Sequence, residues 1–203
     1  MWHDFVPFHL KYKIMRVNII NKLIQLEGLD SLPEIDPNTQ DIPENTDGHV
    51  NRLIQAVIPS VLAGFYKFTR NEQNAAMITT KNAKTDWMEI LFSDEKKKLV
   101  KKIASYAQVI PGEAETKMQR AAKNIVNIIN EDLAKPDGKN IKKYFTEQRN
   151  NILRHLPGAI EIGDSLNDTT LDDRTNKMSG PVSGIMHSIE KTFASTDTDS
   201  NVK

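Results

Sequence analysis

The sequence predicts an all-α fold, in which one multihelical domain is followed by a disordered C-terminal tail. Three observations lead to this prediction. Apolar residues recur at helical spacing along residues 16–162, whereas Gly, Pro and acidic residues gather between the periodic stretches. Two of the predicted helices share an aligned apolar pattern, which indicates a duplicated helix-pair unit. From residue 163 onward the composition shifts to Ser, Thr, Asp, Asn and Gly, which is typical of a segment without a core of its own.

The stretch 48–68 is the predicted central helix, because its apolar residues form a broad face that other helices must cover. We expect Asp47 to cap its N-terminus. Pro59 removes one backbone hydrogen bond, so the helix should bend or stop between Gln55 and Pro59. Gly64 either makes the helix flexible at a second position or lets a neighbouring helix approach closely. The apolar positions are Val50, Leu53, Ile54, Val57, Ile58, Val61, Leu62 and Phe65.

The elements on either side of the central helix follow in chain order. Residues 1–15 show no clear period, and we interpret residues 1–14 as an extension upstream of a natural start at Met15. A first helix is expected over 16–27, ending at Gly28, before a long acidic loop at 29–47. Helices at 72–80 and 87–92 are expected after the central helix.

The second half of the domain is expected to be helical as well. Ser93 should cap a helix that ends at Pro111-Gly112, and a further helix is expected over 113–134. Asn140 is then predicted to cap a short helix with Tyr144 and Phe145 on its inner face. A separate last core helix, with Ile152, Leu153 and Leu156, should stop at Pro157-Gly158.

The predicted duplication relates the central helix to the helix at 113–134. A shift of 64 residues places Gly48 on Gly112 and Ile54 on Met118, and eight Gly or apolar positions agree without a gap. Any two amphipathic helices share part of such a pattern, because both obey the same period. The paired glycines favour an ancient repeat.

Several residue runs resemble the YidB-like family. Residues 56–64 (AVIPSVLAG) are similar to the helix of that family with the pattern Ala-x-Pro-x-Leu-x-Gly. Residues 103–107 (IASYA) and 111–115 (PGEAE) resemble its second helix pair, and residues 148–153 (QRNNIL) with 156–158 (LPG) resemble its last helix. The likeness covers about 16–162, and departs at Lys123-Asn124 and in the loop 29–47. It implies an all-helical bacterial protein with no established chemistry.

Composition limits the classes of protein to which the chain can belong. Lys and Arg together number 27, as do Asp and Glu, so no net charge draws the chain to nucleic acid or to an anionic membrane. Cysteine is absent, which excludes disulfides, thiol nucleophiles and zinc–thiolate sites. No stretch approaches the ~20 apolar residues of a membrane span. We therefore expect a cytoplasmic protein.

Candidate catalytic residues do not form a constellation in the sequence. His49, His155 and His187 are isolated, and the acid pairs Asp94-Glu95 and Glu131-Asp132 point in different directions because adjacent helical residues do not share a face. No phosphate-binding, dinucleotide-binding or zinc-binding motif occurs. We expect no enzyme activity and no cofactor.

Two functions remain open. The first is a non-enzymatic module that binds an unknown protein partner, with an amphipathic helix at 181–193 docking in cis or in trans from a flexible tail at 163–203. The apolar side chains of that helix are Ile185, Met186, Ile189 and Phe193. The alternative is weak nucleic-acid binding by residues 93–155, where fourteen Lys or Arg stand against eight acids. Its candidate contacts are Lys97, Lys98, Lys101 and Lys102, which otherwise form the solvated face of an amphipathic helix.

Overall fold

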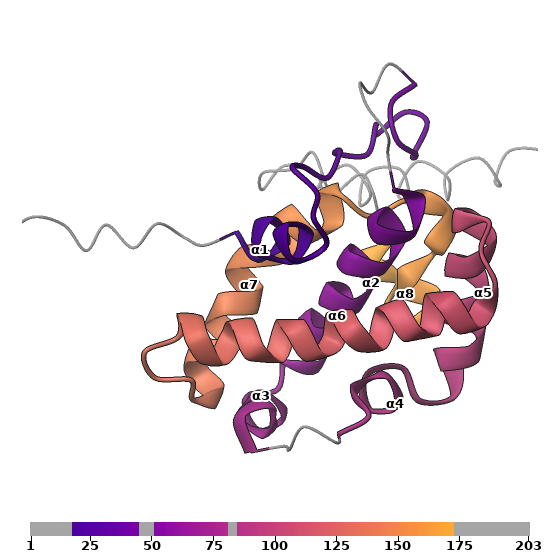
Figure 1. Ribbon diagram of the computed structural model, residues 1–203. Helices are drawn as coiled ribbons and strands as arrows, with labels where there is room; N and C mark the ends of the chain where they lie inside the picture. The colour runs from indigo at the N-terminus through magenta and orange to yellow at the C-terminus, as the bar shows by residue number, and fades with distance from the viewer. Residues whose placement is uncertain (1–17, 45–50, 81–84, 173–203) are drawn as a thin grey trace, which may run out of the picture.

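The computed structural model describes residues 18–44, 51–80 and 85–172, and these residues form an all-α fold without strands (Figure 1). The first helices are α1 (Ile19–Leu26), α2 (Arg52–Phe68), α3 (Glu72–Thr80) and α4 (Trp87–Phe92). The later helices are α5 (Lys96–Ala107), α6 (Pro111–Asp132), α7 (Gly138–Arg154) and the short α8 (Ile162–Ser165). Single turns of 3₁₀-helix lie at η1 (Ser93–Glu95), η2 (Gly158–Ile160) and η3 (Thr169–Leu171).

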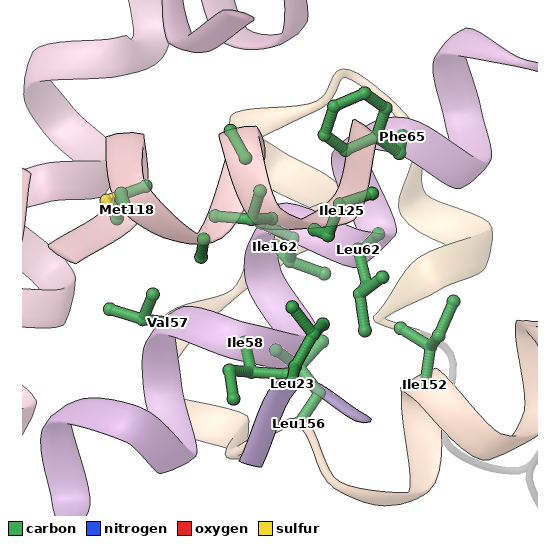
Figure 2. Close-up of a cluster of buried hydrophobic side chains, with 14 of the residues drawn as sticks. Leu23, Val57, Ile58, Leu62, Phe65, Met118, Ile125, Ile152, Leu156 and Ile162 are labelled. Carbon is green, nitrogen blue, oxygen red and sulfur yellow. The ribbon is translucent and has the colours of Figure 1, made fainter. Parts of the chain in front are cut away.

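Helix α2 lies at the centre of the fold, as its apolar pattern predicts. It contacts α5, α6 and α7 along its length, and Figure 1 shows α6 crossing it. Every residue from Leu53 to Phe65 is buried. Figure 2 shows part of the resulting core, where Leu23 of α1, Leu62 of α2, Met118 of α6, Ile152 of α7 and Ile162 of α8 are among the side chains drawn. The helices at 72–80 and 87–92 are confirmed with the predicted bounds.

Pro59 does not end α2, so a stop at that position is wrong. The helix runs through Pro59 without interruption, because its neighbours pack around it on all sides and outweigh one missing backbone hydrogen bond. The side chain that caps α2 is Asn51, whose Oδ1 accepts from the Ile54 N–H at 3.0 Å. Asp47, the predicted cap, lies outside the described residues.

The ends of the neighbouring helices differ from the prediction. Helix α1 begins later than expected, after its Asn18 cap, and Gly28 with φ of 71° follows its end as predicted. Ser93 does not cap α5; it has φ of 44° and opens the turn η1. Pro111 does not end α5 but begins α6, where proline is favoured because the first helical residue needs no amide partner.

Helix α7 replaces the two helices predicted between residues 140 and 156. The polar run 148–151 does not interrupt it, since Gln148 is buried in line with Phe145 and Ile152. The cap is Asp137, whose Oδ1 accepts from the Asn140 N–H at 2.9 Å, and not Asn140. The separation into two helices is therefore wrong.

The domain also extends further than residue 162, where the sequence places its end. Residues 158–172, which we call the C-terminal strap, continue through η2, α8 and η3. Leu166 and Leu171 are buried at 3% and 1% exposure, so this part of the predicted tail belongs to the core. The predicted extension 1–15 and the predicted helix 181–193 lie outside the described residues.

The duplication stays a prediction. Its two proposed helices, α2 and α6, pack against each other, but this contact does not relate one helix to the other by descent. Gly48, which the alignment pairs with Gly112, lies outside the described residues.

Candidate interaction surface

Helix α5 turns a charged face to solvent. Leu99, Val100 and Ile103 are buried against the core. The opposite side exposes Lys97, Lys98, Lys101 and Ser105, which follow one another at helical spacing. The four predicted nucleic-acid contacts thus share one helix but fall into two classes, because among the residues that the structure describes only Lys98 and Lys102 have a carboxylate partner.

Lys98 and Lys102 form ion pairs with the C-terminal strap. Asp164 Oδ2 lies 2.7 Å from Lys98 Nζ and 3.0 Å from Lys102 Nζ, and Glu161 Oε2 lies 2.8 Å from Lys102 Nζ. Hydrogen bonds from Lys98 and then Lys102 lower the pKa of Asp164 below its usual range. The hydrogen bond that Lys98 donates to Asp164 likewise raises the pKa of Lys98. These pairs are open to solvent, so each stabilises the fold only weakly.

Lys97 and Lys101 are exposed and form no ion pair with any residue in the described ranges. They stand four residues apart and therefore one above the other on the helix. Their ammonium groups remain available to a partner's carboxylates.

An exposed apolar corner follows the same helix. Ile110, between α5 and α6, is 71% exposed, and its neighbours Pro111 and Gly112 are exposed too. Hydrogen bonds fix the corner on both sides: the Val109 N–H donates to Ala104 O at 3.0 Å, and Ile110 O accepts from the Glu113 N–H at 3.1 Å. Ile110 is thus held in place with its side chain in solvent.

The strap that covers the paired lysines is anchored independently of them. Besides its buried leucines, it is closed by Asp172, whose carboxylate accepts from the Gly163 N–H at 2.8 Å and the Asp164 N–H at 3.1 Å. Arg70, after α2, pairs with Asp168, and Arg149 on α7 donates to Thr170 O at 3.4 Å.

The acidic loop is fixed to the inner side of α5 by a second polar cluster. Tyr106 Oη donates to Asp41 Oδ1 at 2.6 Å, and the Arg52 guanidinium lies 3.4 Å from Asp41 Oδ2 and 5.3 Å from the centre of the Tyr106 ring. Burial acts to raise the pKa of Asp41, but the hydrogen bonds from Tyr106 and from the Ile42 N–H outweigh it and lower that pKa. Burial, with the Asp41 hydrogen bond, raises the pKa of Tyr106. These contacts hold the acidic loop against α5 and the start of α2.

The other candidate residues take structural positions. His155 is buried, and its Nδ1 donates to Asn151 O at 2.8 Å. One small hollow lies between α4 and α6, lined by Asp86, Trp87 and Gln119 among others. No group of three or more His, Asp or Glu with metal-binding geometry occurs within the described ranges. Ile185, Met186, Ile189 and Phe193 lie outside those ranges.

Comparison of the chain with protein-family models, curated proteins and solved structures found no match. None of the helices in the described ranges has both the length and the apolar character that crossing a membrane requires.

Ile110 and the acids of the strap are the parts of this surface that the sequence analysis missed. Ile110 stands beside Val109 in an apolar pair, and the pair gives no sign of which side chain faces solvent. Asp164 falls within the segment assigned to the tail, and Glu161 lies just before it. The sequence around these two residues does not indicate that they form ion pairs with lysines of α5.

Proposed function

We propose that this protein is a non-enzymatic helical module that binds another protein through the corner between α5 and α6. The observation that carries the proposal is the exposure of Ile110, at 71%, on a backbone fixed by hydrogen bonds. A single exposed aliphatic residue is common on protein surfaces. Ile110 differs because hydrogen bonds fix the backbone around it and exposed polar groups lie next to it, the arrangement of an interface anchor with its rim.

The sequence supplies further support that the structure leaves untested. The predicted amphipathic helix 181–193 suits docking into a groove of a partner or of this chain through Ile185, Met186, Ile189 and Phe193. The resemblance to the YidB-like family supports a bacterial, helical protein, and that family has no established chemistry. We place it in the cytoplasm, where a chain without cysteine is unaffected by reducing conditions, and cell fractionation tests this location.

Site-specific photo-crosslinking tests the proposed function. A photoreactive amino acid replaces Ile110 in the full chain, and irradiation in living cells should join it to one recurrent protein, identified by mass spectrometry. The matched control carries the same amino acid at Glu147, which is exposed on α7. If position 110 yields no product beyond those from position 147, the corner is not a binding surface and the proposal fails.

The nucleic-acid alternative receives less support from the geometry. Two of its four lysines, Lys98 and Lys102, already bind carboxylates of the chain itself. A gel-shift titration with nonspecific DNA and RNA at several salt concentrations measures any such binding directly.

A further inference from the structure

We propose that the partner presents an acidic segment, in which carboxylates bind Lys97 and Lys101 while an apolar side chain covers Ile110. This inference rests on the proposed function and adds the chemistry of the partner. It follows from three features of the surface: a spare lysine pair, an internal example of how such a pair binds a carboxylate, and an apolar residue at the end of the same helix.

The internal example is the strap. Lys98 and Lys102 are four residues apart, and Asp164 Oδ2 bridges their ammonium groups at 2.7 and 3.0 Å. Lys97 and Lys101 repeat this spacing one residue earlier on the same helix. Because side chains four residues apart on a helix are neighbours, a carboxylate can bridge the free pair in the same way.

The exposed face continues from the free pair towards the apolar corner. Lys97, Lys101 and Ser105 are exposed on successive turns of α5, and Gln108 and Ile110 are exposed just after it. A protein segment lying along this face meets two positive charges first and the aliphatic side chain at its end. An extended or helical segment with acidic residues near one end and a Leu, Ile or Phe near the other is complementary to it.

The surrounding charges favour such a segment over a polyanion. Glu161 and Asp164, which bind the adjacent Lys98 and Lys102, have side chains 64% and 51% exposed, and Glu113 is exposed next to the corner. A continuous phosphate backbone would meet these carboxylates, whereas a segment with two or three carboxylates and an apolar residue avoids them. The same acids limit nonspecific binding of acidic chains, which is how like charges provide specificity.

Peptide titration by NMR tests the chemistry of the partner. The probe is a short synthetic helical peptide with two Glu residues one turn apart followed by a Leu, and the comparison peptide carries Gln in place of Glu. Added to the isotope-labelled full chain, the Glu peptide should shift the amides of Lys97, Lys101 and Ile110 together and saturably, and the Gln peptide should bind more weakly.

Two double variants form a matched pair for this titration. Lys97→Gln with Lys101→Gln should weaken binding of the Glu peptide about tenfold. Lys98→Gln with Lys102→Gln, which removes the same charge from the lysines held by the strap, should change it less than about twofold. Lys97, Lys98 and Lys101 are exposed and Lys102 is partly buried, so the amide spectrum of each variant verifies its fold.

Three outcomes overturn the inference: equal binding of the Glu and Gln peptides, equal losses in the two double variants, or a single-stranded DNA oligonucleotide that displaces the Glu peptide from these residues. Crosslinking from position 110 in the Lys97→Gln, Lys101→Gln background separates this inference from the proposed function. An undiminished crosslink means that the partner binds without the lysines, so the inference fails and the proposed function stands. Absence of a crosslink in the unmodified background removes the proposed function itself.

Discussion

Gly64 of α2 lies directly against the aromatic ring of Phe92 at the end of α4. A Cβ atom at position 64 would come within 2.7 Å of Phe92 Cζ, closer than packed carbon atoms approach. This contact confirms that Gly64 admits a close neighbour. Phe92 is 3% exposed, so its ring has little freedom to move aside.

Replacing Gly64 with alanine should therefore destabilise the protein, although alanine is the better helix former. Overpacking costs about 1–3 kcal/mol, and the gain in helix propensity offsets about 1 kcal/mol of this. Urea unfolding of Gly64→Ala should therefore show a lower free energy of unfolding than that of the unmodified protein. Gly112→Ala is the control, since nothing lies within 4 Å of a Cβ atom there. Equal stabilities for the two variants would contradict the contact.

Because the C-terminal strap is part of the core, we expect the stability of a truncated chain to depend on whether the strap is retained. A chain ending at residue 162 loses the buried side chains of Leu166 and Leu171, and each buried leucine contributes about 1.5–3 kcal/mol. Its melting temperature should fall markedly. A chain ending at residue 172 keeps every contact of the strap described above and should melt close to the full chain. If both shortened chains melt alike, the strap is not part of the core.

Because of the ion pair between Arg70 and Asp168, we expect the free energy of unfolding to decrease at acidic pH. Burial acts to raise the pKa of Asp168, but hydrogen bonds from Thr170 and the Arg70 charge bring that pKa below its ordinary value of 3.8. Because the folded state holds the proton less tightly than the unfolded state, this stabilisation is present above pH 3.8 and is lost as the pH falls through the lowered pKa.

An NMR titration of the Asp168 carboxyl group measures this shift. Arg70→Gln should raise the pKa of Asp168. Arg120→Gln on α6 removes a similar cation, one that pairs with Glu27 at the end of α1, and should leave the pKa of Asp168 unchanged. An unchanged pKa of Asp168 in Arg70→Gln would show that the ion pair does not form in solution.

We expect that replacing the buried polar residue Gln55 with an apolar one destabilises the protein. It is fully buried, and its Nε2 donates to His155 O at 2.6 Å and to Pro33 O at 3.1 Å, which ties the acidic loop to the end of α7. Gln55→Met keeps the size but leaves both carbonyls without this donor, at a cost of about 1–3 kcal/mol in the free energy of unfolding. Gln73→Met, at an exposed site on α3, should change it by less than about 0.5 kcal/mol.

The sequence predicts the helices whose apolar period is strong and fails where the signal is polar or distant. The central helix, α3 and α4 follow from periodicity alone. The sequence predicts two separate helices where α7 is continuous, and the residues between them, 148–151, are polar. No Gly or Pro breaks this run, and Gln148 is buried in line with Phe145. The strap has only scattered apolar residues, and carboxylates such as Asp172 satisfy its backbone. A composition rich in Asp, Asn and Thr looks the same in capped turns and in a disordered segment.

The candidate surface was predicted only in part, for a related reason. The lysines of α5 are visible in the sequence as an outer helix face, so their exposure could be expected. Which of them are free depends on Glu161 and Asp164, about sixty residues further along the chain. Such pairing at long range has no local pattern, and the exposure of Ile110 rather than Val109 depends on the turn between two helices.

The central position of α2 has a consequence for biosynthesis. A ribosome synthesises the chain from its N-terminus at roughly 5–20 residues per second. Helix α2 is complete at Phe68, whereas α7, which packs against it, is complete only at Arg154. The apolar surface of α2 therefore stays incompletely covered for on the order of ten seconds in every round of synthesis. Nascent chains of this protein are suited to capture by a chaperone at the ribosome, and crowded polysomes are the place where they are most liable to aggregate.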